Sequence, residues 1–262
     1  MITSLSNAKV KLVRALARRR ARYAARQFVI EGVRLIEEAA GAGIVPALVL
    51  YAARVDEEPR AHILLDRLRA ATPKVYAVSD AVMQAVSSTE APQGIAAVVS
   101  FVELPLPTPL QFVLILDAVR DPGNVGTILR SARAAGVDAI FFAPGTADPY
   151  NDKVVRAAMG AHFRVPLRVA PWKDIHSLLH GIPRVYLADA RGEIDYARAD
   201  WSRPVALIVG GEAEGASDAA KEIATARVNI PMRGGAESLN AAMAATVLLF
   251  EAARQSRRKY EG

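Results

Sequence analysis

The sequence predicts an α/β fold in two domains, and three observations support this prediction. Short apolar runs alternate with helical patterns along most of the 262 residues, as in sheets covered by helices. Three prolines at alternate positions in residues 103–110 favour a stiff, extended connection. Later apolar runs stop at glycines, as buried strands do beside a ligand-binding loop. We therefore expect a small α/β module over residues 1–102, a proline-rich linker over 103–110 and a second domain over 111–262.

Composition excludes several classes of function. The chain has no cysteine, which rules out disulfides, thiolate nucleophiles and cysteine-bound zinc. Its apolar runs are shorter than the roughly 18 residues of a membrane helix, and its first residues lack the apolar core of a signal peptide. We therefore expect a cytoplasmic protein that does not span a membrane. The net charge of +6 favours a polyanionic partner.

Positive charge is concentrated at the start of the chain. Residues 1–34 contain a single acid, Glu31, and nine basic residues: Lys9, Lys11, Arg14, Arg18, Arg19, Arg20, Arg22, Arg26 and Arg34. Ser6 can cap a helix from Asn7 whose buried stripe is Val10, Val13, Leu16 and Ala17. The basic residues form either an ordinary solvated face or a phosphate-binding surface, which gains from counterion release. We favour phosphate binding by Arg18, Arg19, Arg20, Arg22 and Arg26.

The first module alternates strands and helices after this basic segment. The expected strands are 28–32, 47–51, 74–79 and 94–101, and the expected helices are 33–43, 59–71 and 80–88. Gly41 and Gly43 suit the end of the first helix, and Ser79 or Asp80 can cap the third. This order is typical of a compact α/β module.

The second domain opens with a buried strand over 111–119 that leads into a helix ending at Gly136. Asn124 is either the N-cap of this helix or a residue directed at a ligand. Arg130 follows six positions later, which is about 240° beyond a whole number of helical turns. Asn124 and Arg130 therefore do not share a face unless Asn124 precedes the helix. Repeated βα patterns after Gly136 predict an open sheet with parallel strands.

The last part of the chain concentrates glycine loops and polar side chains. A strand over 205–209 stops at Gly210, and the loop after it carries two carboxylates, one of them Glu214. A second strand over 228–232 precedes the loop that brings Ser238 and Asn240 to the final helix, which Ser238 can cap. Ordinary tight turns explain the glycines alone. They do not explain Glu214, Ser238 and Asn240 together, and the P-loop and GxGxxG nucleotide motifs are missing.

Histidine spacing gives only a weak signal for a metal. His176 and His180 are four residues apart, as in a helical zinc pair, but Ser177 stands where a metalloprotease needs glutamate. His162 has no carboxylate nearby in the sequence with which to form a triad. We expect no metal site.

Three blocks together resemble the SpoU (TrmH-type) RNA 2′-O-ribose methyltransferases of the SPOUT superfamily. These blocks are residues 117–136, 207–215 and 230–254. Three earlier segments resemble the substrate-binding module of that family, which has an L30e-like fold: residues 2–9, 28–32 and 92–99. The resemblance therefore covers nearly the whole chain, and the order and spacing of the three later blocks make it specific.

The resemblance implies a SPOUT α/β domain with a carboxy-terminal trefoil knot, S-adenosylmethionine as cofactor and a homodimer with active sites near the interface. Carried over residue by residue, it implies catalytic roles for Asn124, Arg130, Glu214, Ser238 and Asn240. It also implies cofactor contacts by Gly210, Ile230 and Leu239. One departure is Ala241-Ala242, where many members of the family have valine followed by a small polar residue.

The chemistry implied by the resemblance is an in-line displacement, which needs two aligned reactants and a route for the hydroxyl proton but no metal. Arg130 either holds the phosphate beside the target ribose or helps to activate the 2′-hydroxyl, although a guanidinium is a poor base. We expect an RNA 2′-O-methyltransferase that modifies 23S ribosomal RNA. The alternatives are a transfer RNA 2′-O-methyltransferase, a base methyltransferase of the same superfamily, and a non-catalytic RNA-binding protein of the same fold.

Overall fold

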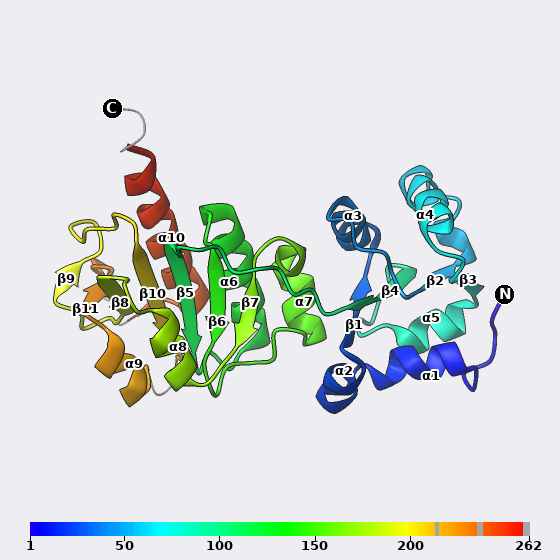
Figure 1. The fold of residues 1–262 in the computed structure, drawn as a ribbon. Helices are drawn as coiled ribbons and strands as arrows, with labels where there is room; N and C mark the ends of the chain where they lie inside the picture. The colour runs from blue at the N-terminus through cyan, green and yellow to red at the C-terminus, as the bar shows by residue number, and fades with distance from the viewer. Residues whose placement is uncertain (213–214, 235–237, 259–262) are drawn as a thin grey trace. The chain divides into compact units, whose positions relative to one another are not determined.

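The computed structural model describes residues 1–212, 215–234 and 238–258. The chain divides into two compact units (Figure 1). Unit 1 contains Met1–Val102 and Tyr150–Phe163, and unit 2 contains Glu103–Pro149 and Arg164–Gly262. Residues 150–163 therefore belong with unit 1, although the sequence analysis assigned them to the second domain. Within the described ranges, no helix has both the length and the apolar character that crossing a membrane would require.

Unit 1 is built on a mixed four-stranded sheet in the order β1-β4-β2-β3. Its strands are β1 (Gln27–Glu31), β2 (Leu48–Ala52), β3 (Val75–Val78) and β4 (Ile95–Ser100). Strand β4 runs antiparallel to β1 and β2, whereas β2 and β3 are parallel. The helices between them are α3 (Val33–Gly41), α4 (Pro59–Ala71) and α5 (Asp80–Val86). Each expected element of this module is present, and Ser79 caps α5 as predicted.

The basic segment forms two helices instead of the single helix predicted. Helix α1 (Ala8–Ala15) is capped by Asn7, whose side chain accepts a hydrogen bond from the Lys9 amide, so the prediction that Ser6 is the cap is wrong. Helix α2 (Arg19–Ala25) follows after a short break. Ala17 lies in that break and is exposed, which contradicts its expected place in the core.

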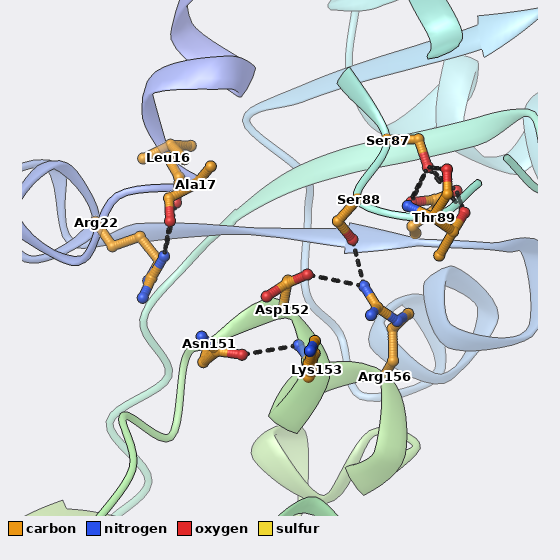
Figure 2. Close-up of polar contacts among 11 residues, drawn as sticks. Leu16, Ala17, Arg22, Ser87, Ser88, Thr89, Asn151, Asp152, Lys153 and Arg156 are labelled. Carbon is orange, nitrogen blue, oxygen red and sulfur yellow. Dashed lines mark hydrogen bonds and ion pairs between the residues drawn. The ribbon is translucent and has the colours of Figure 1, made fainter. Parts of the chain in front are cut away.

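Arg22 is buried, with 4% of its surface exposed, because it closes the end of α1. Its Nη1 donates hydrogen bonds to the carbonyls of Leu16 at 3.0 Å and Ala17 at 2.7 Å. Figure 2 shows this contact. A cation suits this position, since the last carbonyls of a helix lack partners within the helix. The prediction that Arg22 contacts phosphate is therefore contradicted by its burial.

Residues 150–163 join unit 1 through aromatic packing and an arginine. The rings of Phe101 and Tyr150 stack with centroids 3.7 Å apart, and Phe28 lies 5.1 Å from Tyr150. Helix α7 (Asp152–Ala158) follows, and its Arg156 contacts Ser88 and Asp152 (Figure 2). The short helix η2 (Ala161–Phe163) adds Phe163 to the same apolar core. These contacts join segments far apart in the sequence, so local periodicity could not reveal them.

Unit 2 has a sheet whose seven described strands are all parallel, in the order β7-β6-β5-β10-β8-β11-β9. They are β5 (Phe112–Asp117), β6 (Ala139–Phe142), β7 (Leu167–Val169), β8 (Arg184–Ala188), β9 (Ile194–Asp195), β10 (Val205–Gly210) and β11 (Ala226–Asn229). The described helices of the unit are α6 (Pro122–Ala135), α8 (Trp172–Leu178), α9 (Asp218–Ile223) and α10 (Ala241–Arg258). The predicted open parallel sheet is confirmed.

The side of the sheet on which new strands are added changes at β5. From β5 the chain adds β6 and β7 on one side, then crosses to β8 on the other side, and β10 later inserts between β5 and β8. In open parallel sheets, ligands bind outside the carboxyl ends of the strands at such a point. The loops after β5, β8 and β10 are therefore where a site is expected.

Candidate active site

The two central strands of unit 2 end side by side. In the parallel register, Asp117 at the end of β5 is paired with Gly210 at the end of β10. The loop after β5 leads directly into α6, whose N-cap is Asp121: its Oδ1 accepts a hydrogen bond from the Asn124 amide at 2.7 Å. Asn124 is thus inside the first turn of α6, and the prediction that it could be the cap is wrong.

The final helix begins at Ala241 and is capped by Asn240. The Asn240 Oδ1 accepts hydrogen bonds from the amides of Ala242 at 2.9 Å and Met243 at 3.3 Å. Ser238 lies in the exposed segment before the helix, so the prediction that it is the N-cap is wrong. Asparagine satisfies the first free N–H groups of the helix here and keeps its amide NH₂ group for other contacts.

Glu212 connects these two asparagines. Its Oε1 accepts hydrogen bonds from the Asn124 Nδ2 at 2.5 Å, from the Asn240 Nδ2 at 3.1 Å and from the Ala241 amide at 3.3 Å. The Asn240 Nδ2 also donates to the Asn124 Oδ1 at 3.0 Å. A carboxylate at the start of α10 is favoured by the free N–H groups of that helix. Three segments distant in the sequence therefore converge on one carboxylate.

Sequence reasoning missed Glu212 and chose the second carboxylate of the same loop, Glu214. Glu214 lies outside the described residues. The position of Glu212, two residues after the last residue of β10, is the signal that could have identified it. The first residues after a buried strand stay close to the edge of the sheet, where the neighbouring loops also end.

A cavity of about 840 Å³ adjoins this cluster, entirely within unit 2. It brings together the three predicted cofactor residues Gly210, Ile230 and Leu239, as well as Ser238 and Asn240. The end of β8 and the loop after it add residues that sequence reasoning did not select: Ala188, Asp189, Ala190 and Arg191. The volume of the cavity is within the range of sites for small molecules, roughly 300–1,000 Å³.

Close backbone packing shapes one wall of the cavity. A Cβ atom on Gly210 would lie 2.8 Å from the Ala216 nitrogen, and one on Gly211 would collide with the Ala118 carbonyl oxygen. Both positions therefore require glycine, and the loop presents backbone to the cavity. This wall suits a ligand that is held largely through peptide groups.

Three cations line the cavity, Arg191, Lys221 and Arg227, and none of them was predicted. Lys221 forms an ion pair with Asp218 at 2.9 Å, and this hydrogen bond holds the pKa of the Asp218 carboxyl below its usual range. Arg227 pairs with Glu193 at 3.2 Å and with Asp189 at 3.6 Å. Lys221 and Arg227 are each paired with a carboxylate, so these two side chains make the wall polar without adding uncompensated charge.

Arg130 is separate from this cluster. It lies in the same helix as Asn124 and is exposed, whereas Asn124 is half-buried. The helical geometry places the two side chains on different faces of α6, as the sequence spacing predicted. Arg130 is also not part of the cavity wall in the described residues. In this single chain, the structure therefore brings together Asn124, Glu212 and Asn240 but not Arg130.

In the described parts of the chain, no three histidine, aspartate or glutamate side chains are placed to bind a metal ion together. His162 is buried in unit 1, where its ring lies 5.8 Å from that of Phe28.

Comparison with known proteins identifies both parts of the chain. Residues 111–250 match the model of the SpoU rRNA Methylase family, and residues 7–97 match that of the MRM3-like substrate binding domain. The 23S rRNA (guanosine(2553)-2′-O)-methyltransferase RlmP of Bacillus subtilis is 38% identical over 95% of this chain and 97% of its own length. The 23S rRNA (uridine(2479)-2′-O)-methyltransferase of Streptomyces viridochromogenes is 34% identical over 92% of this chain and 87% of its own.

Solved structures agree with the sequence comparison. The AdoMet-bound rRNA methyltransferase from Sinorhizobium meliloti superposes with a TM-score of 0.85 at 33% identity, and the match covers 97% of each chain. The SpoU methyltransferase AviRb from Streptomyces viridochromogenes in complex with AdoMet also gives 0.85, at 32% identity over 95% of this chain and 98% of the other. Family model, full-length relatives and fold all agree, and the chain belongs to the SpoU rRNA methylase family.

Proposed function

We propose that the chain is an RNA 2′-O-ribose methyltransferase that uses S-adenosylmethionine and modifies 23S ribosomal RNA. The observation that carries the proposal is the convergence of Asn124, Glu212 and Asn240 beside the cavity of unit 2. The full-length relatives with named substrates support ribosomal RNA over transfer RNA. A binding protein would need the fold and the basic surface, but it would not need this hydrogen-bonded cluster.

The cavity fits the cofactor in size and in the character of its wall. Gly210, Ile230 and Leu239 would hold S-adenosylmethionine, with the tight glycine loop offering backbone groups to it. When bound, the cofactor supplies the electrophilic methyl group. No metal ligand is needed for this chemistry.

The chain's own residues would align the target ribose. Glu212 accepts from the amides of both Asn124 and Asn240, which fixes the orientation of the two side chains before RNA arrives. Ser238, at the cavity wall, would donate or accept a hydrogen bond near the reacting hydroxyl. Arg130 would bind the phosphate beside the ribose, and Glu214 remains a predicted participant. Alignment by fixed groups lowers the barrier because the entropy of ordering is removed in advance.

Mapping 2′-O-methylation tests this function directly. Total RNA from wild-type cells and from cells lacking the gene should differ at one or a few nucleotides of 23S ribosomal RNA, and the purified protein should restore the mark. A missing mark in transfer RNA would favour the alternative substrate. No missing 2′-O-methyl group in either RNA would contradict the enzyme and favour the non-catalytic RNA-binding protein.

The first prediction concerns Glu212. Glu212→Ala should lower the single-turnover methylation rate by about 10²-fold, because two asparagine amides lose their common acceptor and the site loses its alignment. Glu212→Gln should retain more activity, since its amide oxygen still accepts. The matched control is Glu222→Gln on the exposed face of α9, which should react like wild type. Equal methylation rates for Glu212→Ala and wild type would show that Glu212 does not contribute to the reaction.

The second prediction distinguishes two roles for Arg130. If it binds phosphate, Arg130→Lys should keep part of the activity and Arg130→Ala should lose about 10²-fold, while cofactor affinity measured by calorimetry stays unchanged. If it acts as base, the wild-type rate should rise with pH through an ionisation that Arg130→Lys abolishes. Single-turnover rates from pH 6 to 10 decide between these roles. Lys173→Ala on α8 serves as the charge control, and wild-type rates for Arg130→Ala would exclude both roles.

We also propose that unit 1 binds RNA through its basic segment. Arg18, Arg19, Arg20 and Arg26 are exposed, and Arg19 and Arg26 lie over the rings of Tyr23 and Phe101 at 5.2 Å and 5.6 Å. The rings restrain these two side chains near the surface, so less freedom is lost when they bind phosphate. The match of this region to a substrate-binding domain supports the same assignment.

The third prediction is a change in salt dependence. Arg18→Ala/Arg20→Ala should flatten the plot of log affinity against log salt by roughly 0.7–0.9 per lost phosphate contact. The matched control, Arg67→Ala/Lys74→Ala, removes two exposed cations from another part of unit 1 and should leave the slope unchanged. Equal slopes for the Arg18→Ala/Arg20→Ala variant and wild type would assign the segment to an ordinary solvated face. Arg22→Ala should act differently from these surface changes, since it removes two buried hydrogen bonds and should lower thermal stability.

The proposed assembly is a homodimer. Met243 and Phe250 are seven residues apart on α10, on one face, and 63% and 47% exposed. Large apolar side chains in a row on a helix favour burial against a partner, and a second copy of the chain fits the dimer that the family resemblance implies. The trefoil knot implied by the family resemblance and the cytoplasmic location expected from composition also stay predictions.

The fourth prediction tests this dimer. Phe250→Glu should shift the protein from dimer to monomer in sedimentation experiments at micromolar concentration, because a carboxylate would have to be buried in the interface. Leu178→Glu, at another exposed apolar side chain on α8, is the control and should leave the mass unchanged. A monomeric wild-type protein, or a dimeric Phe250→Glu variant, would contradict this use of α10.

A further inference from the structure

The loop that carries Glu212 is closed on itself in the described residues. Gly211 and Gly215 form an isolated antiparallel bridge, and shortly after it Ser217 begins α9 by accepting a hydrogen bond from the Ala220 amide at 3.2 Å. Gly210, Glu212 and Ala216 also line the cavity. A residue on such a loop keeps its position only if the loop is fixed to a rigid element.

Asp117 provides this connection from β5. It is the last residue of the strand, is 1% exposed and is paired with Gly210. Its Oδ2 accepts a hydrogen bond at 2.6 Å from the amide of Ser217, which lies 100 positions later in the chain. A hydrogen bond to a carboxylate is roughly twice as strong as one between neutral groups.

The second carboxylate oxygen of Asp117 lowers the stability of the folded state. Its Oδ1 is buried and has no hydrogen-bond partner among the described atoms. Burying a carboxylate with an unmet acceptor destabilises the folded state, so such a group calls for a functional explanation. Asp117 is absent from the described cavity wall, so its link to the cavity is the loop whose Ser217 amide it holds.

Steric contacts leave the loop little room to absorb a displacement. Gly211 lies so close to the Ala118 carbonyl that a Cβ atom would collide with it, and a Cβ atom on Gly210 would lie 2.8 Å from the Ala216 nitrogen. Ala118 itself has a positive φ of 54°, an uncommon conformation for alanine. The end of β5 and the two described ends of the loop therefore form one closely packed body. A shift at Ser217 would move the residues that line the cavity.

We propose that Asp117 is a positioning residue. By holding the Ser217 amide, it fixes the loop after β10 and thereby the cavity wall and the carboxylate of Glu212. The identity of the ligand in this inference rests on the proposed function, whereas the anchoring of the loop does not. Asp117→Asn keeps an oxygen that can accept from Ser217, and Asp117→Ala does not, so the two variants separate anchoring from simple loss of packing.

Two measurements on the full-length protein test the proposal, and they form the fifth prediction. In hydrogen exchange, the Ser217 amide should exchange about 10-fold faster in Asp117→Ala than in wild type, and near the wild-type rate in Asp117→Asn. In calorimetry, the Kd for S-adenosylmethionine should rise about 10-fold or more in Asp117→Ala and stay within about 3-fold in Asp117→Asn.

Ile115→Ala is the control for a general loss of stability. Ile115 is fully buried two residues earlier in β5, so the variant should lower the melting temperature without raising the Kd or exposing the Ser217 amide. An unchanged exchange rate of the Ser217 amide in Asp117→Ala would contradict the claim that Asp117 holds the loop. Faster exchange with unchanged cofactor affinity would overturn the positioning role. If wild type transfers no methyl group to RNA, the proposed function fails, while the exchange measurement still decides whether Asp117 holds the loop.

Discussion

The parallel pairing of β5 with β10 is the constraint on which the site of unit 2 depends. These strands are separated by almost ninety positions in sequence but pair in register from Val205 opposite Phe112 to Gly210 opposite Asp117. Because parallel strands end at the same edge, the loops that follow them must meet. Asn124 and Glu212 come within hydrogen-bond distance as a consequence, and α10 then brings Asn240 to the same point.

The polar groups of this site satisfy one another before any ligand binds. Glu212 links two asparagines and the start of α10, and Asn240 uses its oxygen for the helix and its nitrogen for the cluster. A network in which each member has partners holds its geometry more firmly than isolated side chains do. The relative orientation of Asn124, Glu212 and Asn240 is therefore built into the folded chain. Arg130 is exposed on another face of α6 and lies outside this network.

Charge serves different purposes in the two units. In unit 1 most of the arginines near the start of the chain are exposed, but Arg22 is buried and holds the end of α1. In unit 2 two of the three cations at the cavity, Lys221 and Arg227, are paired with carboxylates. Exposed positive charge suits an RNA backbone, whereas charge paired with a carboxylate suits a small-molecule site. A count of basic residues cannot distinguish these cases, because burial decides which of them can reach a partner.

Local sequence features were enough to predict the α/β class, the extent of most strands and helices and the family resemblance, because apolar periodicity, glycine positions and motif spacing are found within short segments. It also identified Asn124, Asn240 and the cavity residues Gly210, Ile230 and Leu239. The tertiary structure alone showed that Glu212 joins the two asparagines, that Arg22 is buried and that residues 150–163 pack with unit 1. Each of these depends on contacts between segments far apart in the chain. Strand register decides which carboxylate reaches the asparagine amides, and packing decides which arginine meets the end of α1. Strand register and packing both depend on distant parts of the chain, so a local stretch of sequence does not reveal them.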